Sequence, residues 1–247
     1  PAKALWIDII HPSDEELEAV EQQLGIEIPS KKEVWKNHVL NRQYVQDGVA
    51  YMTAAIIIKI GTPFPDTSAV TFILSPHYLL TVRYIMPTSF TTFGQRIQLH
   101  CGEFGTPGQT LEGLLEEIIT RVAHNSEVVV ETLDDISHNI FCGQALEEKR
   151  AHGQVMKEVL RRLGTSADLN SKINESLHSI SRMLSFFKQV VPHDSELDQA
   201  LDILVTDAHS LTKQTAFLSD KITFQLDALL GMINVEQNLI IKIFSVV

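Results

Sequence analysis

The sequence predicts an α/β protein: a mixed α/β unit in the N-terminal part, followed by long helices and a very long C-terminal helix. Three observations indicate this class. Short β-branched segments alternate with helical segments up to residue 108. From Thr110 onward, apolar residues recur at helical spacing with few breaks. From Ser195 to the end, a 3-4 apolar alternation continues with one glycine and no proline.

Residues 1–108 are predicted as the α/β unit, and its first elements have clear local signals. Residues 4–10 are apolar and partly β-branched, which predicts a strand. The run Ser13-Asp-Glu-Glu16 is a capping box, so we expect a helix from there to about Leu24, ended by Gly25. A second short helix is predicted over residues 31–37, after Pro29.

The remaining elements of this unit are predicted as strands and one helix. Residues 49–60 form a strand whose unbroken IIIKI end indicates burial on both faces. Residues 69–74 and 78–84 are two strands of a hairpin that turns at Ser75-Pro76-His77. Residues 88–99 are predicted as a helix, and the glycine-rich run GEFGTPG at 102–108 as a break.

Residues 109–194 are predicted as a long helical hairpin. The first helix covers residues 110–150, with residues 155–163 continuing it through Gly153. A turn is expected at Gly164-Thr165-Ser166, followed by a helix to about Val191.

Residues 195–247 are predicted as one helix that leads toward a first transmembrane helix. At about 1.5 Å per residue this helix is roughly 80 Å long. A helix of that length is not expected to be covered by its own chain, so the pattern predicts partner helices and a homo-oligomer. The apolar end, NLIIKIFSVV, predicts that the chain is trimmed at the membrane.

Composition narrows the function classes. The formal net charge of -11 argues against a nucleic-acid partner, because phosphate binding requires a basic surface. Two distant cysteines, Cys101 and Cys142, indicate a reducing compartment. No phosphate-binding loop, nucleophile elbow or HExxH motif is present in the sequence, so we expect neither an enzyme nor an organic cofactor.

Two sets of residues are candidates for metal binding. His138 and Cys142 are four residues apart on a predicted helix, although two ligands do not complete a site. Glu127, Glu131 and Asp134, with Asp135 beside them, lie one and two turns apart on the same helix. Carboxylates suit hard cations such as Mg²⁺, but a solvated helix face has the same pattern.

A polar interruption near the C-terminus is the candidate pore element. Asn234, Asn238, Ile241 and Ser245 follow 4-3-4 steps along the last helix. In a parallel bundle these residues would form rings around one axis, and rings of amide oxygens accept a hydrated cation. The alternative is that Asn238 only fixes helix register, as a buried Asn does in coiled coils.

The segment FLSDKITFQLDALLGMINVEQNLIIKIFSVV (217–247) resembles the end of the stalk helix of CorA magnesium channels. Three further stretches agree in order: ALWIDIIHPSDEELEAVEQQLGIEIPS, VAYMTAAIII and VTFILSPHYLLTVR resemble the opening strand and helix and the sheet of that family. The similarity therefore spans nearly the whole chain.

The resemblance implies an α/β/α sandwich with a mixed sheet, followed by long antiparallel helices and a very long C-terminal stalk helix. It also implies a homopentamer in the inner membrane, with this chain on the cytoplasmic side and two membrane helices per subunit after it. It implies transport of Mg²⁺, and also Co²⁺, with a Gly-Met-Asn signature beyond Val247. Asn238 matches a polar pore ring, and Ile241 and Phe244 match apolar pore-lining positions that would form a gate. Cytosolic Mg²⁺ is expected to close the pore.

One position departs from the family pattern. An acidic pair expected in the short second helix, which would hold regulatory Mg²⁺ against an acid of the neighbouring stalk, is replaced by Trp35-Lys36. Glu33 is a substitute ligand, and Asp202 and Asp207 are the candidate stalk acids. Two alternatives remain: a zinc or nickel transporter of the same superfamily, and a soluble helical scaffold without a transport role.

Overall fold

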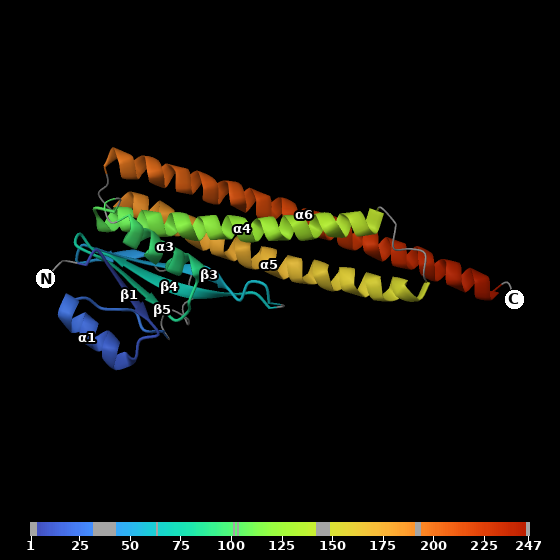
Figure 1. Ribbon diagram of the computed structural model, residues 1–247, viewed down its shortest axis with the longest axis horizontal. Helices are drawn as coiled ribbons and strands as arrows, with labels where there is room; N and C mark the ends of the chain where they lie inside the picture. Colours follow the sequence, from blue (N-terminus) through green and yellow to red (C-terminus); the bar gives the residue numbers. More distant parts are fainter. Residues whose placement is uncertain are drawn as a thin grey trace.

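The computed structural model describes residues 4–31, 43–62, 64–100, 102, 104–141, 149–190 and 194–245. The chain is elongated, with a sheet and its covering helices at one end and three long helices that extend past the sheet (Figure 1).

The sheet has five strands in the order β1-β5-β4-β3-β2. The strands are β1 (Trp6–Ile10), β2 (Tyr44–Gln46), β3 (Val49–Ile58), β4 (Asp66–Leu74) and β5 (Leu79–Arg83). Strands β1 and β5 pair in parallel and the other neighbours pair antiparallel, which confirms the predicted mixed sheet. Strand β3 is buried from Ala50 to Ile57. The predicted burial of the IIIKI end holds only for Ile56 and Ile57, because the strand ends at Ile58 and the side chains of Lys59 and Ile60 are exposed.

Helices cover both faces of the sheet, which confirms the α/β/α sandwich (Figure 1). On one face, α1 (Asp14–Leu24) packs with Leu17 against Ile73 and Leu80. On the other face, α3 (Thr88–Leu99) and α4 (Pro107–Phe141) pack with Phe90 and Leu114 against Phe72.

The capping box of α1 forms as predicted. The Ser13 hydroxyl accepts a hydrogen bond from the Glu16 N–H at 3.2 Å, and the Ser13 N–H donates to the Glu16 carboxylate at 2.8 Å. Gly25 follows the helix with a φ of 66°, in the left-handed region that favours glycine. The predicted short helix at 31–37 falls on residues of which only Lys31 is described.

The two remaining helices are α5 (Lys149–Val190) and α6 (Ser195–Ser245), and α5 runs antiparallel to α4 (Figure 1). The predicted turn at Gly164-Thr165-Ser166 is therefore wrong, and residues 155–163 belong to α5 and do not continue α4. A glycine in a helix costs about 1 kcal/mol, and packing offsets that cost here, since Leu163 and Ser166 are both buried.

Helix α5 also closes the open edge of the sheet. Strand β2 pairs with β3 only at residues 49–51, so the rest of that edge of β3 has no strand beside it among the described residues. At Ala55 the hydroxyl of Ser176 donates to the carbonyl oxygen at 2.7 Å, and the Ala55 N–H donates to the Ser179 hydroxyl at 2.8 Å. Side chains of a helix thus replace the missing strand.

Helix α6 lies along α4 and α5 for most of its length. Its buried residues begin at Leu197 and continue to Leu229. One side of α6 is therefore covered by its own chain as far as Leu229, so the expectation that the chain does not cover this helix is wrong for that side. Past that residue, Figure 1 shows the end of α6 extending beyond both neighbouring helices.

Candidate functional site: helix α6 and the acidic helix faces

Buried polar contacts fix the position of α6 against its neighbours. The Gln225 side-chain amide donates to the Leu133 carbonyl oxygen at 2.7 Å and to the Ser137 hydroxyl at 2.6 Å, on α4. The Asn170 amide of α5 donates to the Thr215 carbonyl oxygen at 2.9 Å. A helix held by such contacts cannot rotate or slide without leaving buried polar groups unpaired.

The opposite side of α6 carries apolar residues that are exposed in this chain. Ile203, Phe217 and Phe224 are each more than 60% exposed and are separated by fourteen and seven residues. Asn238, also exposed, lies fourteen residues after Phe224. Seven-residue steps place residues on one line in a supercoiled helix, and we call these four residues the α6 heptad line.

The heptad line was not singled out in the sequence. The 3-4 alternation that predicts this helix corresponds to the side of α6 that faces α4 and α5, where Leu201, Leu204 and Leu218 are buried. The seven-residue spacing of Phe217 and Phe224 is visible in the sequence. It is less regular than the 3-4 pattern of the buried side and was therefore not predicted as a separate face.

The predicted pore residues lie at the C-terminal end of α6. Asn234 and Asn238 are exposed, and so is Val235. Ile241 and Phe244 belong to the helix, but their side chains lie outside those described. Within the described residues, no helix is long and apolar enough to cross a bilayer.

Two of the predicted metal ligands are paired with lysines. Asp134 on α4 contacts Lys221 on α6. Asp202 on α6 contacts Lys188 on α5 at 2.5 Å, and Asp198 contacts the same lysine at 3.1 Å. The hydrogen bond that Lys188 donates to Asp202, and then the one that it donates to Asp198, raises the pKa of Lys188 above its usual value. These carboxylates join helices within one chain.

The other predicted ligands have fewer contacts. Glu127 lies 4.0 Å from a ring nitrogen of His124. Glu131 and Asp207 are exposed, and neither has an ion pair among the residues that the structure describes. Glu33, Trp35 and Lys36 lie outside the described residues.

The described side chains do not form a complete metal site. No three His, Cys, Asp or Glu side chains come together as a possible metal site in this part of the chain. His138 and Cys142 were also predicted as possible ligands. His138 is exposed on α4, and Cys142, like Cys101, lies outside the described residues. The described side chains of this chain therefore do not by themselves complete a site for a regulatory ion.

Comparison with known proteins decides the family. The model of the CorA-like Mg²⁺ transporter protein family matches residues 1–247. The chain belongs to this family. The resemblance seen in the sequence is thereby confirmed, and the activity that the family description names is transport of Mg²⁺, not catalysis.

Individual relatives agree with this assignment. The magnesium transport protein CorA of Escherichia coli K12 is 28% identical over 246 residues, covering 99% of this chain and 75% of the relative. The CorA protein of Yersinia pseudotuberculosis is 28% identical over 248 residues, covering 100% of this chain and 76% of the relative.

Solved structures share the fold. The CorA magnesium transporter of Methanocaldococcus jannaschii superposes with a TM-score of 0.76 at 18% identity, covering 97% of this chain and 73% of that one. The cytoplasmic domain of ZntB from Vibrio parahaemolyticus superposes with a TM-score of 0.68 at 10% identity, covering 94% of this chain and 91% of that domain.

Proposed function

We propose that this chain is the cytoplasmic part of a pentameric Mg²⁺ channel of the inner membrane, in which α6 of each copy continues into the membrane and lines the pore. The observation that carries the proposal is the α6 heptad line, together with the family assignment. Phe217 and Phe224 are each more than 60% exposed in this chain, and four neighbouring copies around one axis bury this exposed apolar surface.

The end of the heptad line then forms the pore entrance. Asn238 of five copies makes a ring of amide oxygens that accept hydrogen bonds from the water shell of Mg²⁺. Ile241 and Phe244 follow within two turns of the helix and form an apolar constriction. Such a constriction blocks ions when it is dry and conducts when it widens enough to hold water.

We assign regulation by cytosolic Mg²⁺ to acidic residues that form no ion pair with a lysine in the described part of the chain, and to Glu33, which lies outside that part. Asp202 and Asp134 are neutralised by lysines within the chain, so binding a cation there would require displacing Lys188 or Lys221. Asp207 forms no ion pair with a lysine in the part of the chain that the structure describes. Asp207, with Glu33, Glu127 and Glu131 as further candidates, bridges copies through Mg²⁺ in the closed state, and loss of the ion opens the pore.

The test is Mg²⁺ flux through the natural full-length protein in liposomes. Flux is expected to rise when Mg²⁺ on the side of this chain falls, and to be inhibited by added Mg²⁺ more strongly than by Zn²⁺ or Ni²⁺. Equal flux at low and high Mg²⁺ would reject the regulation. Transport of Zn²⁺ or Ni²⁺ with no Mg²⁺ flux would reject the choice of cation and favour a transporter of another metal.

A matched pair of variants tests the carboxylate assignment. Asp207→Asn is expected to weaken inhibition by Mg²⁺ by about tenfold, because one charged ligand is lost. Asp202→Asn, on the same helix, is expected to leave inhibition nearly unchanged, because Lys188 already neutralises that carboxylate. The reverse order of effects would show that Asp202 is the ligand.

A further inference from the structure

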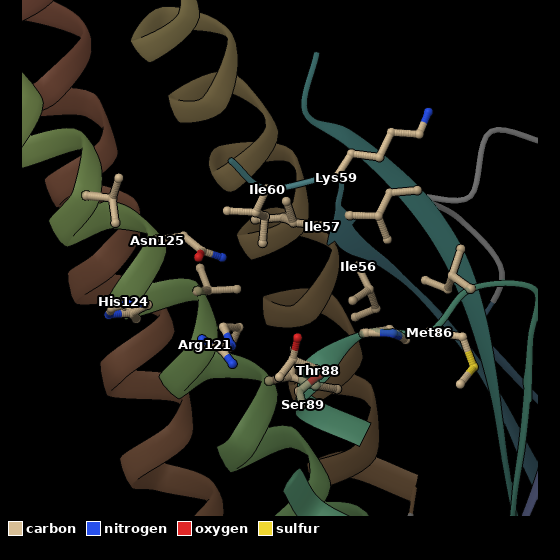
Figure 2. A pocket seen from close by; sticks show the side chains of 16 residues that line it. Ile56, Ile57, Lys59, Ile60, Met86, Thr88, Ser89, Arg121, His124 and Asn125 are labelled. Carbon is tan, nitrogen blue, oxygen red and sulfur yellow. The ribbon is translucent and has the colours of Figure 1, made fainter. Parts of the chain in front are cut away.

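A cavity of about 510 Å³ lies on the face of the sheet that α3 and α4 cover, between α4, the end of β3 and the start of α3 (Figure 2). This volume is in the range of small-molecule sites in proteins. Its rim reaches the surface, since Met86 is 66% exposed and Ile60 is 38% exposed. The cavity residues come from elements other than α6, so the inference below is independent of the proposed function.

The ionisable residues that line this cavity are all basic. They are Lys59, Arg121 and His124, and among the described lining residues none is acidic. This is unusual in a chain with 31 acidic and 20 basic residues. Lys59 is paired with Asp66 at 3.5 Å, and His124 is 4.0 Å from Glu127. Arg121 has no carboxylate partner in the described part of the chain, so its charge is available to a ligand.

A buried polar side chain is directed into the same space. Asn125 is 2% exposed, and its side-chain nitrogen Nδ2 has no hydrogen-bond partner among the described residues. Figure 2 shows this amide pointing from α4 toward the space beside Ile57, with Arg121 one turn away on the same helix. A buried amide without a partner costs stability, so its retention indicates a ligand that accepts the hydrogen bond.

The N-terminus of α3 contributes further donors. Thr88 and Ser89, the first residues of this twelve-residue helix, line the cavity. Pro87 in the capping position makes no side-chain hydrogen bond to the helix, and the first turn contains no acidic residue. The partial positive charge of the helix end therefore faces the cavity without compensation.

The rest of the wall is apolar and is held in place by a buried arginine. Ile57, Ile60 and Ile118 line the cavity together with Ile85 and Met86. Arg83 is 4% exposed, and its Nη1 donates to the Ile85 carbonyl oxygen at 2.6 Å and lies 3.3 Å from the Met86 sulfur. The segment that forms this wall is thus fixed to the sheet.

We infer that this cavity binds a small organic anion with a short apolar body, a carboxylate or a phosphate monoester. Arg121 neutralises the anionic head, and the Asn125 amide and the N–H groups at the start of α3 donate hydrogen bonds to its oxygens. The isoleucine wall covers the apolar body. The site is separate from the proposed pore residues and borders the acidic face of α4 at His124, and it makes the sheet end of the molecule responsive to an organic acid.

Methyl NMR of the isoleucine-labelled chain provides the test, with sodium hexanoate as the probe. Hexanoate is expected to shift the methyl resonances of Ile57, Ile60 and Ile118 in a saturable manner. Hexylammonium, which has the same body and the opposite charge, is expected to cause no saturable shift. No saturable shift with hexanoate, or equal affinity for the two probes, would overturn the inference without any variant being needed.

Three variants then locate the binding groups. Arg121→Ala is expected to weaken hexanoate binding by at least about tenfold. Lys213→Ala removes one positive charge from an exposed position on α6 and should leave binding unchanged. Asn125→Leu is expected to weaken binding without lowering the melting temperature, since it removes an unpaired buried amide. Unchanged binding in Arg121→Ala, or equal losses in Arg121→Ala and Lys213→Ala, would contradict the site.

Discussion

Ser176 and Ser179 show how single hydroxyl groups determine where a long helix lies. Both bond to the backbone of Ala55 in the middle of β3, where no neighbouring strand is available. Apolar packing alone tolerates small shifts of a helix, whereas two hydrogen bonds to one residue do not. Neither serine was predicted as important, because a serine on a helix looks the same whether it contacts water or a strand.

Removal of either hydroxyl should therefore destabilise the chain. We expect Ser176→Ala and Ser179→Ala each to lower the free energy of unfolding by about 1–2 kcal/mol, because a buried backbone group loses its partner. Ser185→Ala is the matched control, since its hydroxyl bonds only within α5 and is exposed. Urea denaturation followed by circular dichroism measures all three, and equal small effects would contradict the role of the edge contacts.

Tyr51 should be recognisable by its titration. Burial, and then the charges of Tyr44 and Tyr78, raise the pKa of Tyr51 from 10.0 to about 12. Because the pKa in the folded chain is above that of the unfolded chain, the stability linked to this group is present below pH 10 and is lost as the pH rises toward 12.

Absorbance of ionised tyrosine measures this directly. The last tyrosine to ionise in the folded chain should disappear from the titration in Tyr51→Phe. The variant should also lose less stability than the parent chain between pH 10 and pH 12. A Tyr51→Phe chain with the same late titration step would assign that step to another tyrosine and contradict the assignment.

At the scale of elements, predictions succeeded where the determinants are local in sequence. The capping box of α1, the hairpin between β4 and β5 and the bounds of α3 follow from neighbouring residues, and all were predicted. The continuity of α5 through Gly164 was not predicted, because it depends on packing against helices distant in sequence. The same limit applies to α6, whose cover by α4 and α5 is a tertiary property.

Two glycines in helices provide opposite predictions about these elements. A methyl group added at Gly164 would meet no atom within 4 Å, so Gly164→Ala should stabilise the chain by about 0.5–1 kcal/mol through its helix propensity. A methyl group at Gly113 on α4 would lie 2.5 Å from Phe104 and 3.0 Å from Phe93.

Gly113→Ala should therefore destabilise the chain by about 1–3 kcal/mol, because the added carbon overpacks the contact between α3 and α4. Thermal and urea unfolding compare both variants with the parent chain. A destabilising Gly164→Ala substitution would indicate that α5 is interrupted at this glycine, as the sequence alone had indicated.

At the scale of the whole molecule, the family and the fold could be predicted from the sequence, but the arrangement of the candidate site could not. Asp134 and Asp202 were predicted as ligands from their residue type, whereas ion pairs with lysines of other helices depend on the tertiary structure. The cavity beside Asn125 was also not predicted, because its residues come from three separate parts of the chain. The proposed assembly rests on the heptad line of α6.

The most direct test of that connection is the mass of the natural full-length protein, measured by native mass spectrometry after extraction from the membrane in a mild detergent. Five copies per particle are expected, with the α6 helices side by side and Asn238 at the axis. A particle that contains one or two copies would contradict the assembly around α6, and with it the assignment of Asn238, Ile241 and Phe244 to a pore.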